Sequence, residues 1–334
     1  MAFSAGWRRS GSRPREPACR RREGAPGRVP GPAPGSGGRG RGVRVTLWGT
    51  RGSLPSAGPE TVRYGGNTAC VEVRGCAGTV LILDAGTGLR RLGAALPGDL
   101  PRVDILLTHL HLDHLQGLGF FPPLFREGTA VHIWGPPSTT QDLRTRLARY
   151  LSPPLFPMPL RDVPGQLVLH DLPLAPFALG EFEVDADLVC HPGPTAGLRI
   201  AEDGAVLAYL PDHEPALCSR HFPDLPEWTS GYGVAAGADL LIHDAQYTAE
   251  EYAQHVGWGH SAFPHALAFA RLAGVRRLMT FHHDPAHADD LLDALMATAP
   301  RDLPFELLPG REGTTVEVGP RVGADGQGEA PRQA

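Results

Sequence analysis

The sequence has no lysine, and all 31 of its basic residues are arginine. Together with 42 glycines and 34 prolines among 334 residues, this usage is typical of a GC-rich genome and by itself indicates no function. No apolar run approaches the roughly 18 residues that a membrane-spanning helix needs, and the N-terminus lacks the apolar core of a signal peptide. We therefore expect a cytoplasmic protein without a membrane segment.

Cysteine is also scarce. The five cysteines are an odd number and contain no CxxC pair; they are Cys19, Cys70, Cys76, Cys190 and Cys218. This usage argues against a disulfide framework and suits a reducing cytosol.

Charge is distributed unevenly along the chain. Residues 1–42 hold ten arginines against Glu16 and Glu23, a balance of +8, so the remainder carries −13 of the overall −5. The tail is too rich in glycine and proline to bury a core, and we expect residues 1–42 to be disordered. We interpret this tail as an upstream extension, such as a misassigned start codon would give, and a nucleic-acid-binding tail is the alternative. A basic tail can attract nucleic acid, whereas the acidic body argues against a large nucleic-acid footprint.

Strand and helix patterns follow the tail without another domain boundary. In the first half, apolar segments predict strands at 43–50, 69–75, 79–84, 103–109 and 130–137. Ser138 and Gln141 predict a capping box that begins an amphipathic helix over 139–151. In the second half we expect strands at 165–172, 182–191, 196–202, 205–213, 238–247 and 276–284, with helices at 263–274 and 287–299. Two strand-rich halves with helices predict two sheets packed face to face and covered outside by helices.

The stretch THLHLDHLQGL at 108–118 directly follows one of these apolar strands. On an extended segment His109 and His111 point to the same side, and Asp113 and His114 follow where the chain turns. Buried imidazoles and carboxylates are costly without partners, so a core would not select them. The loop can present two imidazoles to one metal and a carboxylate with an imidazole to its neighbour. Zn, Mn or Fe suits such ligands; a histidine-rich turn is the alternative.

The H-x-H-x-D-H string at a strand end resembles the signature of the metallo-β-lactamase fold hydrolases. The segment WGTRGSLPSAGPETVRYGGNTACVEV resembles a branch labelled cyclic-nucleotide phosphodiesterase-like, which is similar to ribonuclease Z and PhnP-like phosphodiesterases. The resemblance covers the chain from about residue 43 to its end. It implies an α/β fold, the four-layer αββα sandwich, with a hydrolase domain at 43–320 and a flexible tail at 321–334.

The resemblance also implies three further metal ligands at later strand ends. They are His191 in DLVCHPGPTAG, Asp212 in AVLAYLPDHEP and His282 in RRLMTFHHDP, with His283 as the alternative to His282. Turn roles are the alternatives for His191 and Asp212, and His213 is a less favoured ligand beside Asp212. Two divalent ions, zinc or else Mn or Fe, would lie ~3.5–4 Å apart and be bridged by hydroxide. The implied ligand sets are His109, His111, His191 and Asp212 for one ion, and Asp113, His114, Asp212 and His282 for the other.

LLIHDAQYT and GWGHSAF resemble the ribonuclease Z stretches HEATF and GHST, where an acid–histidine pair assists the leaving group. This implies that Asp244 orients His260 and that His260 is the general acid; with Asp113 they form the expected catalytic set. The alternative is that His260 caps the helix near residue 263. Asp84 is implied to brace the metal loop, with a turn role as the alternative.

These features predict a metal-dependent phosphodiesterase that acts on a small phosphodiester or cyclic nucleotide. Asn67 and Thr68 are candidate donors to its phosphate. Only 21 positions separate His191 from Asp212, which leaves no room for the long arm with which many ribonucleases Z grip transfer RNA. Nucleic acid is therefore the less favoured partner, and a homodimer is left open. The alternatives are a thioesterase or lactonase of the same fold and a non-hydrolytic metal or redox sensor.

Overall fold

A computed structural model describes residues 42–215, 222–223 and 225–320. The predicted tails, 1–42 and 321–334, lie outside these ranges apart from Gly42. The strands are β1 (Val43–Gly49), β2 (Cys70–Arg74), β3 (Val80–Leu83), β4 (Arg102–Leu106), β5 (Ala130–Gly135), β6 (Gln166–Asp171), β7 (Phe177–Leu179), β8 (Phe182–Leu188), β9 (Ala196–Glu202), β10 (Ala205–Leu210), β11 (Leu240–Asp244), β12 (Arg277–Phe281), β13 (Glu306–Leu308) and β14 (Thr315–Val318).

The α-helices are fewer than the strands in the described ranges. They are α1 (Leu89–Ala95), α2 (Leu143–Ala148), α3 (Tyr232–Ala235), α4 (Ala249–His255), α5 (Phe263–Leu272) and α6 (Asp289–Ala297). Short 3-10 helices span Pro59–Thr61, Leu112–His114, Leu118–Phe120, Pro122–Phe125, Leu160–Asp162 and Pro226–Trp228. None of the helices in the described ranges has the length and apolarity to cross a membrane.

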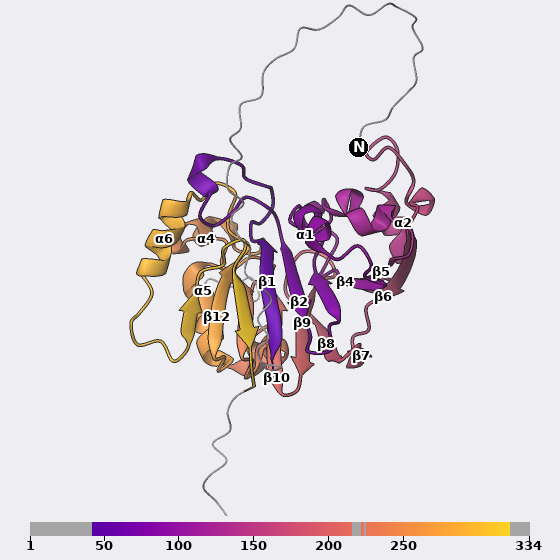
Figure 1. Ribbon diagram of the computed structural model, residues 1–334. Coiled ribbons are helices and arrows are strands. Elements are labelled where there is room, and N and C mark those ends of the chain that lie inside the picture. Colours follow the sequence, from indigo (N-terminus) through magenta and orange to yellow (C-terminus); the bar gives the residue numbers. More distant parts are fainter. Residues whose placement is uncertain (1–41, 216–221, 224, 321–334) are drawn as a thin grey trace, which may run out of the picture. The chain divides into compact units, whose positions relative to one another are not determined.

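The strands form two seven-stranded mixed sheets (Figure 1). The first has the order β14-β1-β2-β3-β4-β5-β6, and the second the order β13-β12-β11-β10-β9-β8-β7. Alternate residues of each strand point to opposite faces, so Val45 and Leu47 of β1 enter the same buried cluster as Leu207 of β10 and Ile242 of β11. This cluster is the core between the two sheets.

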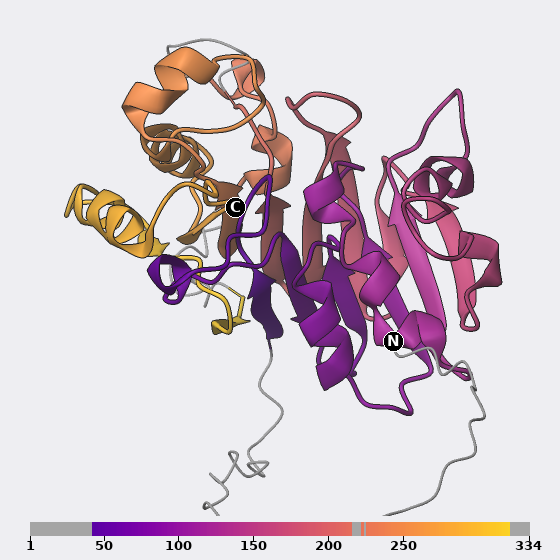
Figure 2. The same ribbon diagram turned by 90° about the horizontal axis from the view of Figure 1, so that it is seen from above.

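Helices cover the outer face of each sheet (Figure 2). On the first sheet, Leu92 of α1 and Leu147 of α2 pack with Ile105 of β4. On the second sheet, Phe269 of α5 packs with Leu241 of β11. The order is therefore helix, sheet, sheet, helix, which confirms the predicted αββα sandwich.

Sheet membership differs from the prediction at β6, and three strands, β7, β13 and β14, were not predicted. The segment at 165–172 was expected in the second half, but β6 pairs in parallel with β5 at the edge of the first sheet. The unpredicted strand β14 returns from the end of the domain to pair antiparallel with β1. Strand patterns identify a pleated segment but not its partner, because pairing is set by contacts distant in sequence.

The start of α2 also differs, since the predicted capping box at Ser138 and Gln141 is wrong. Asp142 is the N-cap, and its side chain accepts a hydrogen bond from the Thr145 backbone N–H at 2.7 Å. Ser138 Oγ accepts only long bonds from nearby backbone, 3.4 Å in the case of Gln141 N–H. Asp142 caps the helix in place of Ser138 because its carboxylate reaches the backbone N–H of the third helical residue, as a strong N-cap does.

A real capping box begins α4, a helix that the sequence reasoning missed. Thr248 Oγ1 accepts from the Glu251 N–H at 3.2 Å, and Glu251 Oε2 accepts from the Thr248 N–H at 2.8 Å. The T-x-x-E spacing that signals such a box is present in the sequence. The helix leads into the segment 256–260, so its start helps to place that segment.

We predict that Thr248→Ala lowers the free energy of unfolding by about 1 kcal/mol, because an N-cap hydrogen bond is lost. Urea denaturation measures the change. Thr145→Ala is the matched control, since Thr145 is exposed inside α2 and alanine is the better helix former there. Equal stability of the Thr248 variant and the wild type would show that the box contributes nothing.

Candidate active site

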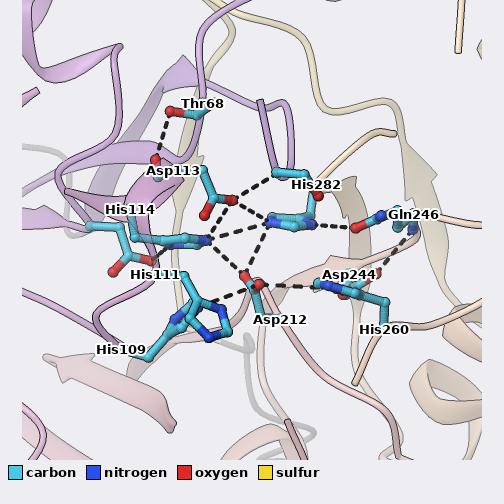
Figure 3. Close-up of polar contacts among 12 residues, drawn as sticks. Thr68, His109, His111, Asp113, His114, Asp212, Asp244, Gln246, His260 and His282 are labelled. Atoms are coloured by element: carbon cyan, nitrogen blue, oxygen red, sulfur yellow. Dashed lines mark hydrogen bonds and ion pairs between the residues drawn. The ribbon is translucent and has the colours of Figure 1, made fainter. Parts of the chain in front are cut away.

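Polar side chains gather where strands of both sheets end. The strands β10, β11 and β12 run parallel, so their carboxyl ends meet at one edge of the second sheet. The side chains that follow strand ends at the site are His109 after β4, His191 after β8, Asp212 after β10 and His282 after β12. Asp113 and His114 lie on the 3-10 helix Leu112–His114. Figure 3 shows His109, Asp113, His114 and His282 converging around Asp212.

One group of side chains surrounds Oδ1 of Asp212. This oxygen lies 3.0 Å from His114 Nε2 and 3.3 Å from His282 Nε2. Asp113 Oδ2 lies 3.4 Å from His114 Nε2 and 3.3 Å from His282 Nε2. The two ring nitrogens are 3.4 Å apart. Two carboxylate oxygens and two imidazole nitrogens therefore face one buried point.

A second group lies at the other oxygen of Asp212. Oδ2 is 3.6 Å from His109 Nε2 and 3.6 Å from His191 Nε2. His111 is more exposed, and its Nδ1 lies 3.1 Å from His191 Nε2. Within each of the two groups the candidate donor atoms all lie within 4.8 Å of one another. Asp212 thus belongs to both groups and faces each with a different oxygen.

In four of the imidazoles, the ring nitrogen that faces away from the cluster (Nδ1) is hydrogen-bonded to an oxygen atom outside the cluster. The pairs are His109 Nδ1 with Thr108 Oγ1 at 3.0 Å, His114 Nδ1 with Asp84 Oδ2 at 2.9 Å, His191 Nδ1 with the Gly259 carbonyl at 2.8 Å, and His282 Nδ1 with Gln246 Oε1 at 2.9 Å. An oxygen acceptor at Nδ1 fixes the proton there and leaves the Nε2 lone pair facing the cluster.

This arrangement fits a divalent cation in each group. Lone pairs of imidazoles and carboxylates face one another at 3.0–3.6 Å, and such acceptors repel unless a positive charge lies between them. His109 Nε2 and Asp212 Oδ1 are buried and make no hydrogen bond in the described part of the chain. Imidazole nitrogen with carboxylate oxygen is a donor set that suits first-row transition metals.

The electrostatics of the cluster agree with that fit. Burial lowers the pKa of His109, and it lowers the pKa of His191 to about 4, so both imidazoles are neutral at pH 7. His114 behaves differently. Burial opposes its charging, but the carboxylates of Asp212 and Asp113 raise its pKa overall. The field at this point therefore favours a positive charge.

His260 and Asp244 form a pair beside the cluster (Figure 3). His260 Nδ1 lies 2.7 Å from Asp244 Oδ2 and 4.0 Å from Asp212 Oδ2. Burial alone would lower the pKa of His260, but Asp244 and the other nearby carboxylates raise it to about 9. Asp244 accepts backbone N–H bonds from Gln246 and Ser261 at 3.0 and 3.2 Å, so its orientation is fixed. His260 does not cap α5, whose N-cap is Ala262.

The structure places His282 in the cluster and turns His283 away from it. His283 donates from Nε2 to the Gly310 carbonyl at 2.9 Å and lies edge-on to the Tyr64 ring. Its burial lowers its pKa to about 3, so it is a neutral core side chain. The sequence pair "HH" left both open. In the structure His282 has a left-handed backbone (φ 57°), and its ring stacks with those of His114 and His260.

Asp84 has the bracing position implied for it. Besides His114, it accepts from the Thr108 N–H at 2.8 Å and from the Tyr209 hydroxyl at 3.0 Å. The carboxylate therefore ties the histidine-bearing loop to β10 of the other sheet.

The candidate phosphate donors are already bonded within the protein. Asn67 Nδ2 donates to Glu312 Oε2 at 3.0 Å, and Thr68 Oγ1 donates to the Asp113 carbonyl at 2.6 Å. The loop thus uses these groups to anchor itself beside Asp113 rather than to present them to a ligand. A turn-rich sequence does not show this, because the partners are distant in sequence.

Glu214 is a fully buried residue that the sequence reasoning missed. Its Oε1 accepts from the Tyr252 hydroxyl at 2.7 Å and the Gly257 N–H at 2.9 Å, and its Oε2 accepts from the Gly259 N–H at 2.9 Å. Since the Gly259 carbonyl holds His191, Glu214 fixes the segment that positions both His191 and His260. The acid in "PDHE" was visible, but the pattern is typical of an exposed turn.

Two further contacts were also missed. Gln246 orients His282, and the Ser53 backbone N–H donates to Asp113 Oδ2 at 2.7 Å. A cue for Gln246 existed, since it lies two residues after Asp244 at a strand end. No side-chain pattern could have revealed the Ser53 N–H.

Comparisons with known proteins agree with this fold. The family described as "Beta-lactamase superfamily domain" matches residues 79–283. The ribonuclease Z of Mycobacterium sp. (strain KMS) is 27% identical over 308 residues, which cover 84% of this chain and 98% of that protein.

Solved structures share the architecture. The metallo-beta-lactamase fold protein YhfI from Bacillus subtilis superposes with a TM-score of 0.61 and 20% identity, covering 83% of this chain and 100% of that chain. Zn(2+)-bound PqqB from Methylobacterium extorquens superposes with a TM-score of 0.57 and 18% identity, covering 82% of this chain and 99% of that chain. At these identities the likeness concerns the fold.

We predict that Glu214→Gln lowers the free energy of unfolding by about 1–3 kcal/mol, because one amide N–H₂ would face buried N–H donors left without an acceptor. Urea denaturation measures the loss, and faster amide exchange at Gly257 and Gly259 locates it. Glu250→Gln, on the exposed first turn of α4, is the matched control. Unchanged exchange at both glycines would contradict the anchoring role.

Proposed function

This chain belongs to the beta-lactamase superfamily, and from that premise we propose that it is a dinuclear metal-dependent phosphodiesterase. The observation that carries the proposal is the Asp244–His260 pair, joined at 2.7 Å beside the cluster. Hydrolysis of an alkyl phosphodiester releases a poor leaving group that needs a proton. A thioester releases a thiolate, which needs none. The relative named ribonuclease Z supports the same reaction class.

The metal ions would be held by the two groups around Asp212. His109, His111, His191 and Asp212 form one ligand set, and Asp113, His114, Asp212 and His282 form the other. We expect zinc, with Mn or Fe as the alternatives that the same donors allow; the neighbour PqqB is Zn(2+)-bound. Divalent ions bound there would supply an activated water and neutralise charge on the attacked phosphate.

His260 supplies the proton in this proposal. Its Nδ1 is held by Asp244, which leaves Nε2 to donate to the leaving oxygen. The carboxylates raise the pKa of His260 to about 9, so at neutral pH the proton is in place. Asp244 orients the ring and stabilises its charged form, and the backbone N–H groups that hold Asp244 keep the pair in register with the cluster.

The proposed substrate is a small phosphodiester or a cyclic nucleotide. The interval between His191 and Asp212 consists of a turn and the antiparallel hairpin of β9 and β10. It therefore lacks the long insertion that would grip a large RNA. The cysteine usage supports a reducing, cytoplasmic setting.

The first expected outcome concerns metal content. Elemental analysis after zinc supplementation should give about two ions per chain. Asp212→Ala should lose both ions, because each group uses one of its oxygens, whereas His114→Ala should weaken chiefly one. His132→Gln is the control, since His132 pairs with His170 on another part of the first sheet. A metal-free protein after supplementation would contradict the proposal.

The second outcome concerns the leaving group. His260→Ala should slow cleavage of the dinucleotide ApA by roughly 10²–10⁴-fold, the usual range for general acid catalysis. Bis-p-nitrophenyl phosphate should suffer much less, because p-nitrophenolate leaves without a proton. Metal content should stay the same. Equal losses on both substrates with metal retained would exclude His260 as the leaving-group acid.

The pH profile gives an independent check of the same assignment. A general acid works only while protonated, so the ApA rate should fall as pH rises through the pKa of His260. Since Asp244 raises that pKa, Asp244→Asn should move the alkaline fall to lower pH. A profile whose alkaline limb does not move would contradict the pairing. A thioester tested alongside separates the phosphodiesterase from a thioesterase.

A further inference from the structure

A cleft opens directly beside the cluster, and its residues beyond the two histidines take no part in the proposed proton transfer. Its volume is about 450 Å³, and one side is formed by His109 and His111. The segment that leads into α2 and the helix itself also contribute to the lining. The volume is in the range of small-molecule sites.

Two arginines of α2 and its end line this cleft. Arg146 donates from Nη2 to the Pro136 carbonyl at 2.7 Å, and its side chain is 13% exposed. Its Nε is buried and has no hydrogen-bond partner in the described part of the chain. The carboxylate of Asp171 lies 3.8 Å from Arg146 Nη2 and is 62% exposed, so it compensates the guanidinium weakly.

Arg149 lines the same cleft. Its Nη2 donates to Gln141 Oε1 at 2.8 Å, and Gln141 also lines the cleft. A guanidinium has five N–H donors, and the hydrogen bonds of the described residues use one of them. Ser138 and Thr140 also line the cleft, and their hydroxyls are neutral hydrogen-bonding groups.

The charge of the cleft contrasts with that of the body. Its lining includes two arginines and no carboxylate among the described residues, although the chain beyond residue 42 carries a net −13. Local positive charge on an acidic body concentrates an anion at this spot. Beyond His111, the walls at Leu110, Pro192 and Pro194 are apolar.

We propose that this cleft binds a second phosphate of the substrate, so that the substrate class is a phosphodiester that also carries a phosphate monoester. The inference rests on the proposed function, because the scissile diester must lie at the His/Asp cluster. A monoester dianion matches two guanidiniums better than a single-charged carboxylate does, and guanidinium forks bind phosphate oxygens in pairs. The apolar walls would contact the part of the substrate between the two phosphates.

Three dinucleotides test the proposal with the metal-loaded full chain. ApA has only the diester, whereas pApA and ApAp add a terminal phosphate at one end or the other. We expect kcat/KM for one of the phosphorylated forms to exceed that for ApA by about tenfold to a hundredfold, as charge-assisted hydrogen bonds would give. Arg149→Gln should reduce this ratio to about one to threefold.

Arg144→Gln is the matched control, since Arg144 is exposed on the same helix and does not line the cleft. Its ratio should equal that of the wild type, which excludes a general charge effect. Arg146→Gln should reduce the ratio as Arg149→Gln does; because Arg146 also holds Pro136, Arg149→Gln remains the decisive variant if Arg146→Gln does not fold.

The outcomes separate this proposal from the function on which it rests. Equal kcat/KM for ApA, pApA and ApAp would overturn the second-phosphate site while leaving the phosphodiesterase intact. Cleavage of none of them, nor of bis-p-nitrophenyl phosphate or a cyclic nucleotide, would overturn the proposed function, and calorimetry then decides the site alone. Adenosine 3′,5′-bisphosphate should bind about tenfold more tightly than 3′-AMP or 5′-AMP, with the excess lost in Arg149→Gln; equal affinities would overturn the site.

Discussion

The buried carboxylate of Asp212 is the interaction on which the site depends. It follows β10 in the second sheet, is 2% exposed, and faces imidazoles with both oxygens. His109 and His114 reach it from a loop of the first sheet, whereas His191 and His282 follow strands of the second. A buried carboxylate without compensation costs several kcal/mol. Because the imidazoles that face Asp212 come from both sheets, a positive charge that compensates its carboxylate here would also join the two sheets at this edge.

The outer hydrogen bonds decide what those imidazoles can do. Each acceptor at an Nδ1 directs a lone pair toward Asp212, which is the condition for binding a cation. Two of the acceptors depend on further support: the Gly259 carbonyl stays in place because Glu214 accepts its N–H, and Asp84 is held by Tyr209 from β10. Removing a residue such as Glu214 therefore acts on the site through the geometry of His191 rather than through the reacting atoms.

The sequence predicted the family, the hydrolase assignment and the sandwich because their signals are local. Comparison confirms the family. The carboxyl ends of parallel strands lie at one edge of a sheet. That edge is marked in the sequence by the H-x-H-x-D-H string and by single polar residues, such as Asp212, that follow apolar strands. What it missed is non-local. β14 was unpredictable as the partner of β1, and Glu214 reads as a turn acid until Gly257 and Gly259 arrive from distant sequence. The prediction of the α2 N-cap was wrong for another reason. Ser138 and Asp142 are both N-cap residue types close in sequence, and the sequence pattern selected Ser138.

Backbone strain is concentrated at the same place. Of the four non-glycine residues with left-handed backbone in the described ranges, Ser53, Asp84 and His282 touch the cluster, and only Asp203 lies in the β9–β10 turn. Such conformations cost of order 1–3 kcal/mol each and persist where the surroundings over-determine them. Here the Ser53 N–H is bound to Asp113, Asp84 is bound to His114, and His282 is bound to Gln246. The hydrogen bonds that stabilise these left-handed conformations are thus the same bonds that orient the side chains of the cluster. One network therefore accounts both for the orientation of the site and for the strained backbone around it.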